Sequence, residues 1–172
     1  MRRLLEIEDL NVTFRSRKQT VRAVRGISFS MGREKLGIVG ESGSGKSVTG
    51  RSILALIPPP GEVSVRRLIF DGIDLKNASD ATLRKIRGRR VSMVMQDPKY
   101  ALNPVMTIGR QVGEAYLTPH RVTRSEARRK TLEMLATVRI RDPERVYSAY
   151  PHEVSGGMGQ RIMLAMMLIP DP

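Results

Sequence analysis

Interpretation of this 172-residue sequence begins with Gly40-Glu41-Ser42-Gly43-Ser44-Gly45-Lys46-Ser47. The octapeptide matches the phosphate-loop pattern G-x-x-x-x-G-K-[ST] at every fixed position. Residues 35–39, which precede it, are largely apolar, and this short apolar run predicts a buried parallel strand. Apolar residues recur at helical spacing over residues 47–57, and the prolines within residues 58–61 end the predicted helix. A strand, a glycine-rich loop and a helix are therefore expected in the order that such a loop requires.

The residue types in the octapeptide suit contact with a chain of phosphates. Gly43 and Gly45 permit backbone angles and a close approach that a Cβ atom would prevent, so backbone N–H groups can turn inward around phosphate oxygens. Lys46 is expected to reach the β- and γ-phosphates, and Ser47 to offer its hydroxyl to Mg²⁺. The other positions of this candidate site are Gly40, Glu41, Ser42 and Ser44. The alternative is an ordinary Gly/Ser turn before a lysine, which the flanking patterns disfavour.

The composition favours a globular protein with a core. Hydrophobic residues make up 40% of the chain, which is long enough for one domain. The formal net charge of +13 raises nucleic acid or an anionic membrane surface as partners. Arginine is scattered through every segment, however, and no aromatic residues are interleaved with the basic clusters at residues 84–90 and 124–130. We therefore favour a compositional bias over a nucleic-acid interface.

Several kinds of site and segment are missing from the sequence. There is no cysteine, which excludes disulfides, thiolate metal sites and a cysteine nucleophile. The two histidines, His120 and His152, are too few for a histidine-rich metal site. No apolar run approaches the length of a membrane span, and the N-terminus becomes acidic too early for a signal peptide. The sequence thus predicts an intracellular protein, with only peripheral contact to a membrane.

An antiparallel β-layer is predicted before the phosphate loop, and a helical region after residue 122. Thr123 and Glu126 form a capping-box pattern, and Asp142-Pro143 is typical of an N-cap followed by proline in the first helical turn. A final helix is expected from near Ser155 to residue 168. The other expected elements are strands at residues 4–8, 11–14, 21–30, 62–65, 67–70 and 91–95, the last one buried, and a short helix at residues 80–87.

A second glycine-bearing helix start is Val154-Ser155-Gly156-Gly157-Met158-Gly159-Gln160-Arg161. Ser155 can donate its hydroxyl, while Gly156 and Gly157 expose backbone N–H groups at the positive end of a helix. Such a short pattern is weak evidence when it stands alone. Together with the phosphate loop it resembles the ATP-binding cassette (ABC) family, whose signature reads L-S-G-G-Q; Val154 and Met158 replace the first and last residues here.

The resemblance covers nearly the whole chain and favours the branch that imports dipeptides, oligopeptides or nickel. Its additional support comes from Tyr150-Pro151-His152-Glu153 and from the Gln-Asp-Pro-Lys-Tyr-Ala-Leu-Asn-Pro run of residues 96–104. The fold implied is an α/β P-loop NTPase cassette with a parallel core sheet, an antiparallel β-subdomain and a helical subdomain. The expected subdivision is an antiparallel β-layer at residues 1–34, a phosphate-loop core at residues 35–100 and a helical subdomain with the signature at residues 101–161.

The resemblance also implies a mechanism and a set of partners. Two cassettes pair head to tail, with ATP and Mg²⁺ held between the phosphate loop of one and the signature of the other, so Ser155, Gly156 and Gly157 would complete the partner's site. Gln96 matches the glutamine that touches Mg²⁺ and whose loop contacts the membrane-spanning permease subunits. A separate substrate-binding protein would act indirectly, and the cassette would lie at the cytoplasmic face of the plasma membrane. Phe14 is one candidate for stacking on adenine, with packing in the strand core as the alternative.

The sequence departs from the family pattern in its C-terminal part. In the family, an apolar run ending in Asp-Glu follows the signature helix, then a switch histidine; none of these lies within the 172 residues. By their order in the chain, neither His120 nor His152 can be that histidine. Gly159 occupies a position where relatives carry a longer polar side chain. The chain is therefore expected to be incomplete, to bind ATP weakly and to hydrolyse it negligibly by itself.

Two rival interpretations remain open from the sequence. One is a soluble ABC ATPase of translation or DNA repair, which would account for the positive charge but not for the 96–104 run. The other is a non-catalytic fragment that pairs with an intact cassette. The preferred interpretation is the ATP-binding subunit of a peptide or nickel importer, with the transported substrate not readable from the chain.

Overall fold

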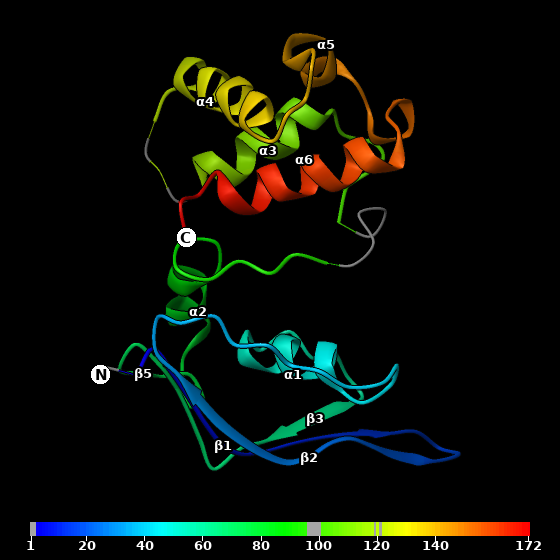
Figure 1. The fold of residues 1–172 in the computed structure, drawn as a ribbon, viewed down its shortest axis with the longest axis vertical. Coiled ribbons are helices and arrows are strands. Elements are labelled where there is room, and N and C mark those ends of the chain that lie inside the picture. Colours follow the sequence, from blue (N-terminus) through cyan, green and yellow to red (C-terminus); the bar gives the residue numbers. More distant parts are fainter. Residues whose placement is uncertain (1–2, 96–100, 119, 121) are drawn as a thin grey trace. The chain divides into compact units, whose positions relative to one another are not determined.

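The computed structural model describes residues 3–95, 101–118, 120 and 122–172, drawn as a ribbon in Figure 1. The chain divides into two compact units, Met1–Leu83 and Arg84–Pro172. Each unit has its own architecture: the first is built around an antiparallel sheet and the second around packed helices. The subdivision at residues 34 and 100 stays a prediction.

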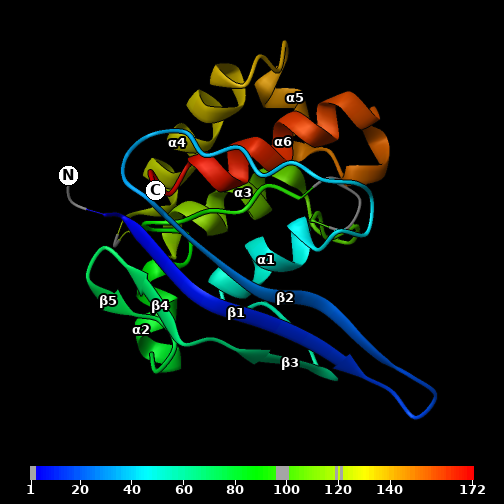
Figure 2. The ribbon, with the colours of Figure 1, turned by 60° about the horizontal axis from the view of Figure 1, so that its bottom comes forward.

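The sheet of the first unit is antiparallel and has the strand order β2-β1-β4-β5, with β3 also paired to β1. Its two longest strands, β1 (Leu5–Arg15) and β2 (Thr20–Met31), form the extended hairpin that Figure 2 shows. The predicted antiparallel layer is confirmed. The remaining strands are β3 (Gly61–Ser64), β4 (Arg67–Phe70) and β5 (Ile73–Asp74).

A register irregularity explains why β1 is predicted as two short strands. Leu5 and Ile7 are buried, but the next buried pair is Leu10 and Val12, so the alternation skips one residue. Asp9, at this irregularity, is exposed and has a φ of 53°. An extra residue in one strand moves the following side chains to the other face. The irregularity therefore keeps Leu10 and Val12 on the buried face of a single strand.

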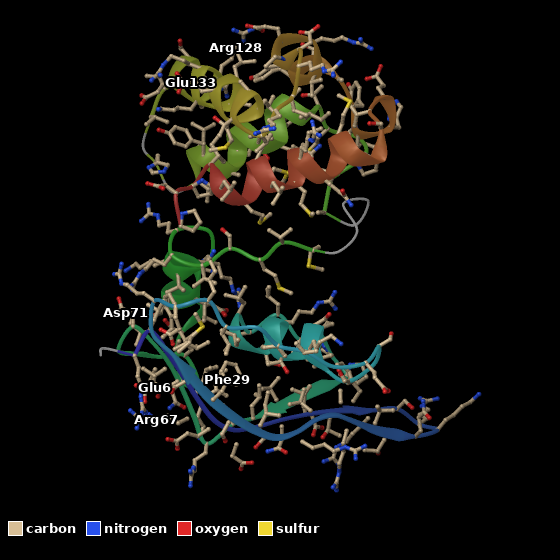
Figure 3. All side chains as sticks on the ribbon, in the orientation of Figure 1. Glu6, Phe29, Arg67, Asp71, Arg128 and Glu133 are labelled. Atoms are coloured by element: carbon tan, nitrogen blue, oxygen red, sulfur yellow. The ribbon has the colours of Figure 1, made fainter. Side chains whose placement is uncertain are left out.

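The hairpin between β4 and β5 is closed by the predicted turn residues Asp71 and Gly72, whose φ values are 45° and 81°. Two consecutive positive φ values match the twist of an antiparallel hairpin, and Asp-Gly tolerates them. Glu6 on β1 and Arg67 on β4 lie close together on this sheet (Figure 3), with 3.4 Å between Oε2 and Nη2. Ion pairs of this exposure contribute little to stability, so the buried apolar face is the main stabilising feature of the sheet.

The predicted buried strands at residues 35–39 and 91–95 are wrong. Residues 35–39 adopt no regular structure, and Val39 is 96% exposed. Residues 91–95 contribute only an isolated parallel bridge between Val91 and Arg87. A strand is stable when its N–H and C=O groups pair with neighbours on both sides. The described strands pair with one another and leave none beside residues 35–39, so an apolar run does not suffice to form a strand there.

Helices make up most of the second unit (Figure 1). They enclose a core in which Ile108, Val112, Leu135, Ile162 and Ala165 have no exposed surface. The elements are α2 (Asp80–Ile86), which crosses the unit boundary, α3 (Ile108–Leu117), α4 (Arg124–Thr137), α5 (Pro143–Ser148), the 3-10 helix η2 (Pro151–Glu153) and α6 (Gly156–Leu168).

The predicted N-caps of the second unit are confirmed. The Thr123 side chain accepts the N–H of Glu126 at 3.2 Å, and the Asp142 side chain accepts the N–H of Arg145 at 3.2 Å. Ser155 caps α6 in the same way. Each bond satisfies one of the N–H groups that the first helical turn leaves without an intrahelical partner.

Helix α3 is not predicted by the sequence analysis, because Gly109 and Gly113 lower the helix propensity of its segment. The structure gives these glycines a packing role. A Cβ atom at Gly109 would lie closer than 3.0 Å to the ring of Tyr147 on α5, and one at Gly113 would lie 3.4 Å from Thr131 Oγ1 on α4. Glycine therefore allows α3 to approach its neighbours closely, and tertiary packing overrides the local preference.

Candidate nucleotide-binding site

The phosphate loop, residues 40–47, leads directly into α1 (Lys46–Ile53) in the first unit. Gly43 and Gly45 have φ values of 82° and 92°, in the left-handed region that favours glycine. At Gly45 a Cβ atom would also lie closer than 3.0 Å to the carbonyl oxygen of Ala23 on β2, whereas at Gly43 it would meet no atom within 4 Å. Gly45 is thus required by the packing of the loop against β2, while Gly43 leaves open space above the loop.

Lys46 folds back onto its own loop. Its Nζ donates to the carbonyl oxygens of Gly40 and Glu41, at 2.6 Å each, and approaches Ser44 Oγ at 3.2 Å. The ammonium group therefore lies within reach of the loop backbone, with neutral oxygens as its partners. A phosphate oxygen would be a stronger acceptor, because it carries negative charge opposite the ammonium group whereas a carbonyl oxygen is neutral. The loop can hold an anion by exchanging those carbonyl contacts for phosphate contacts.

The start of α1 offers further donors to an anion. The first N–H groups of a helix have no intrahelical acceptor, and Thr49, a turn later, donates its N–H to the Gly45 carbonyl at 2.8 Å. Ser47 is exposed in this first turn, so its hydroxyl is accessible. Helix α1 is shorter than predicted: it ends at Ile53, and Ala55 follows with a φ of 50°.

The loop fits a triphosphate better than it fits a bare metal ion. Among the described residues, no cluster of three or more His, Cys, Asp or Glu side chains could hold a metal. Mg²⁺ prefers six oxygen ligands and often keeps several waters alongside a carboxylate and substrate phosphates. A magnesium ion bound at Ser47 would therefore take most of its ligands from phosphate oxygens and water.

The segment before the loop carries one perturbed carboxyl group. Glu34 Oε1 accepts the N–H of Gly32 at 2.7 Å. This backbone hydrogen bond favours the ionised form and lowers the pKa of Glu34 below its ordinary value. Beyond this turn the apolar side chains of Leu36, Ile38 and Val39 are exposed.

The signature residues lie in the second unit, at the N-terminus of α6. Ser155 Oγ accepts the N–H of Met158 at 3.4 Å, which leaves the hydroxyl proton free to donate. Gly156 and Gly157 are exposed, and a Cβ atom at either would meet nothing within 4 Å. Packing within the unit therefore does not require glycine at these two positions. Open space over a helix N-terminus is the local arrangement that an approaching phosphate needs.

Two further candidate residues have different outcomes. Gln96 lies outside the described residues, so its assignment to Mg²⁺ and the permease stays a prediction.

Phe14 is half-buried on β1, paired with Val21 and Gly61, and a Cβ atom at Gly61 would lie 2.8 Å from Phe14 Cε1. The ring therefore packs close to the Gly61 backbone, as the strand-core alternative requires, and contact with adenine stays a prediction.

A family profile described as "ABC transporter" matches residues 24–172, a range that contains both glycine-bearing helix starts. The chain belongs to the ABC transporter family. The predicted family and fold class are therefore confirmed. No helix among the described residues of this cassette is long and apolar enough to cross a membrane.

Curated relatives of the cassette carry names from peptide transport. It is 47% identical over 174 residues to the "Dipeptide transport ATP-binding protein DppD" of Bacillus subtilis, covering 100% of this chain and 52% of the relative. It is 41% identical to the "Oligopeptide transport ATP-binding protein OppD" of the same organism, covering 99% of this chain and 48% of the relative. The chain thus spans about half the length of these proteins. The relatives therefore belong to the peptide-transport branch that the sequence analysis predicted.

Solved cassettes share the fold. The dimeric structure of MJ0796, described as a bacterial ABC transporter cassette, has a TM-score of 0.78 and 25% sequence identity. The comparison covers 98% of this chain and 70% of that one. A second structure of the same protein is described as a post-hydrolysis dimer bound to ADP and Pi, with the same TM-score. The α/β cassette fold is therefore shared, although the described strands of this chain pair only in antiparallel ladders.

Proposed function

We propose that this chain binds the triphosphate of ATP, with Mg²⁺, through residues 40–47. The observation that carries the proposal is the position of Lys46 Nζ, held by two loop carbonyls within a turn whose glycines have positive φ values. The Lys46 ammonium would move from those carbonyls to the phosphate oxygens. The N–H groups of the first turn of α1 would donate to the same anion, and Ser47 would contribute its hydroxyl to the metal.

We further propose that Ser155, Gly156 and Gly157 contact the γ-phosphate held by a second, paired cassette. Their exposure at the N-terminus of α6 supports this role, and the absence of packing around both glycines leaves room for the partner's nucleotide. Gln96 would then link the nucleotide state to permease subunits at the membrane. The whole assembly would import peptides or nickel, with this cassette at the cytoplasmic face of the membrane. The names of the relatives, dipeptide and oligopeptide transport ATP-binding proteins, support the peptide alternative.

Nucleotide affinity tests the role of Lys46. A fluorescent ATP analogue is titrated with Mg²⁺ into the full chain, into Lys46→Ala and into Lys18→Ala, which removes an exposed lysine from the β1–β2 turn. Loss of a charge-assisted bond costs about 1.5–3 kcal/mol of binding free energy. This cost corresponds to a dissociation constant that is roughly tenfold to hundredfold larger. We expect this loss for Lys46→Ala alone. Equal affinities of the two variants would contradict the proposal.

A further inference from the structure

The first turn of α6 is attached to the core of the second unit by one methionine. This helix begins with Gly156-Gly157-Met158-Gly159, so Met158 has the only side chain in the turn. Met158 is half-buried and packs against the apolar cluster that contains Ile108, Leu135 and Ile162. Glycine is a poor helix former and has no side chain to pack. The order of this turn therefore depends on the contact between Met158 and the core.

Two backbone N–H groups report whether this turn is formed. The N–H of Met158 donates to Ser155 Oγ at 3.4 Å, and the N–H of Gly159 donates to the Ser155 carbonyl oxygen at 2.9 Å. The first distance exceeds the usual range of about 2.7–3.2 Å, so the cap by itself holds the turn weakly. If Met158 leaves the core, both N–H groups become accessible to solvent.

Met158 also lines a cavity of about 700 Å³ between α5 and the N-terminus of α6. Among the described residues that line this cavity, it is the one methionine. A cavity of this size admits water and small oxidants. Arg145 and Arg161 line the same cavity, and their N–H groups are donors that a sulfoxide oxygen accepts strongly and a thioether sulfur weakly. An oxidised Met158 would therefore gain polar partners in the cavity and lose its fit against the core.

We propose that Met158 is a methionine oxidation site and that its oxidation opens the first turn of α6. The oxidant is hydrogen peroxide or another hydroperoxide. The sulfur lone pair forms a bond to one peroxide oxygen, the O–O bond breaks, and the proton of the transferred oxygen leaves with the hydroxide as water. Sulfur loses two electrons, the peroxide gains them, and the product is a polar sulfoxide. Methionine sulfoxide reductases reverse this change, so the site can be restored.

Met163 on the same helix supplies an internal comparison for the chemical step. It is 2% exposed and is not among the residues that line the cavity. A sulfur atom enclosed by apolar neighbours is shielded from aqueous peroxide. After brief treatment of the full chain with hydrogen peroxide, peptide mass spectrometry should find Met158 oxidised at least about tenfold faster than Met163. Equal rates at the two methionines would overturn the proposal.

Hydrogen exchange tests the structural consequence. In the oxidised chain the N–H groups of residues 158–159 should exchange at least about tenfold faster than before oxidation, while those of α3 keep their rates. Met158→Leu removes the thioether and keeps an apolar side chain of similar volume. The matched control Met134→Leu removes another half-buried methionine, which packs against the same cluster from α4. We expect oxidation to accelerate exchange in Met134→Leu and to leave it unchanged in Met158→Leu.

Three results would overturn the proposal. Exchange that stays slow in the oxidised parent chain would show that the sulfoxide does not open the turn. Acceleration in both variants would make another methionine responsible. Equal acceleration across α3 would mean that the whole unit unfolds. The measurements use the chain without nucleotide, so their outcome does not depend on the proposed binding of ATP at the phosphate loop.

Discussion

The substitution Gly45→Ala separates two reasons for glycine in the phosphate loop. An alanine there would hold a φ of 92° and would press its Cβ atom against the Ala23 carbonyl. The left-handed conformation costs a non-glycine residue about 1–2 kcal/mol. Overpacking adds about 1–3 kcal/mol, since a backbone oxygen cannot rotate away as a side chain can. Gly45→Ala is therefore expected to destabilise the first unit by about 2–5 kcal/mol.

Two neighbouring glycines supply the controls. Gly43→Ala meets no atom within 4 Å but keeps a φ of 82°, so it should cost only the conformational part, about 1–2 kcal/mol. Gly37→Ala has neither a positive φ nor a close neighbour, and its effect should stay within about 0.5 kcal/mol. The expected order of destabilisation is thus Gly45→Ala, then Gly43→Ala, then Gly37→Ala.

The assay must report on the first unit. All four tyrosines lie at or after residue 100, so tyrosine signals in the near ultraviolet report on the second unit. Urea unfolding by far-ultraviolet circular dichroism gives the overall change in free energy, and hydrogen exchange of peptides from β2 and α1 locates it. If Gly45→Ala is no more destabilising than Gly43→Ala, the contact with Ala23 does not constrain the loop and the reasoning is refuted.

Three further predictions concern the second unit. Gly109→Ala should lower the free energy of unfolding in urea by up to about 2 kcal/mol, because overpacking against Tyr147 exceeds the gain in helix propensity. In a Tyr147→Ala background the same substitution should raise that free energy by about 1 kcal/mol. A change of the same sign in both backgrounds would contradict the proposed packing of Gly109 against Tyr147. Thr131→Val should stabilise by about 1–3 kcal/mol, because Thr131 Oγ1 is buried with no partner among the described residues; a lower urea midpoint would argue against this. The hydrogen bond from Arg129 lowers the pKa of Glu133, so the stabilising contribution of this bond is present at neutral pH and is lost as pH falls through the lowered pKa. NMR titration should find a higher pKa for Glu133 in Arg129→Ala than in the unmodified chain. An unchanged pKa would show that Arg129 is not the cause of the shift.

Helix caps and tight turns could be predicted from local patterns in the sequence. The caps at Thr123, Asp142 and Ser155 depend on side chains that bond to backbone N–H groups a few residues away. The turn at Asp71 and Gly72 follows from the same kind of local constraint. Contacts of this range are encoded in neighbouring residues, so a sequence pattern suffices to find them.

The missed and mistaken elements depend on distant partners. Helix α3 forms although Gly109 lowers its propensity, because Tyr147 packs where a Cβ atom would lie. The segment at residues 35–39 fails to form a strand although it is apolar, because no described strand pairs with it. The hydrogen bond from Arg161 to the carbonyl oxygen of Arg139 also escapes the sequence patterns, because the two residues meet only after α6 packs beside the end of α4.

The central claim is that the phosphate loop binds a nucleotide through Lys46. Chemical labelling tests this claim most directly. An acyl-phosphate derivative of ATP transfers its acyl group to a lysine amine that lies beside the phosphates, and mass spectrometry identifies the modified residue. We predict that the label appears on Lys46 and that excess ATP with Mg²⁺ prevents it. Labelling spread over other lysines, or labelling of Lys46 that excess ATP leaves unchanged, would contradict the claim.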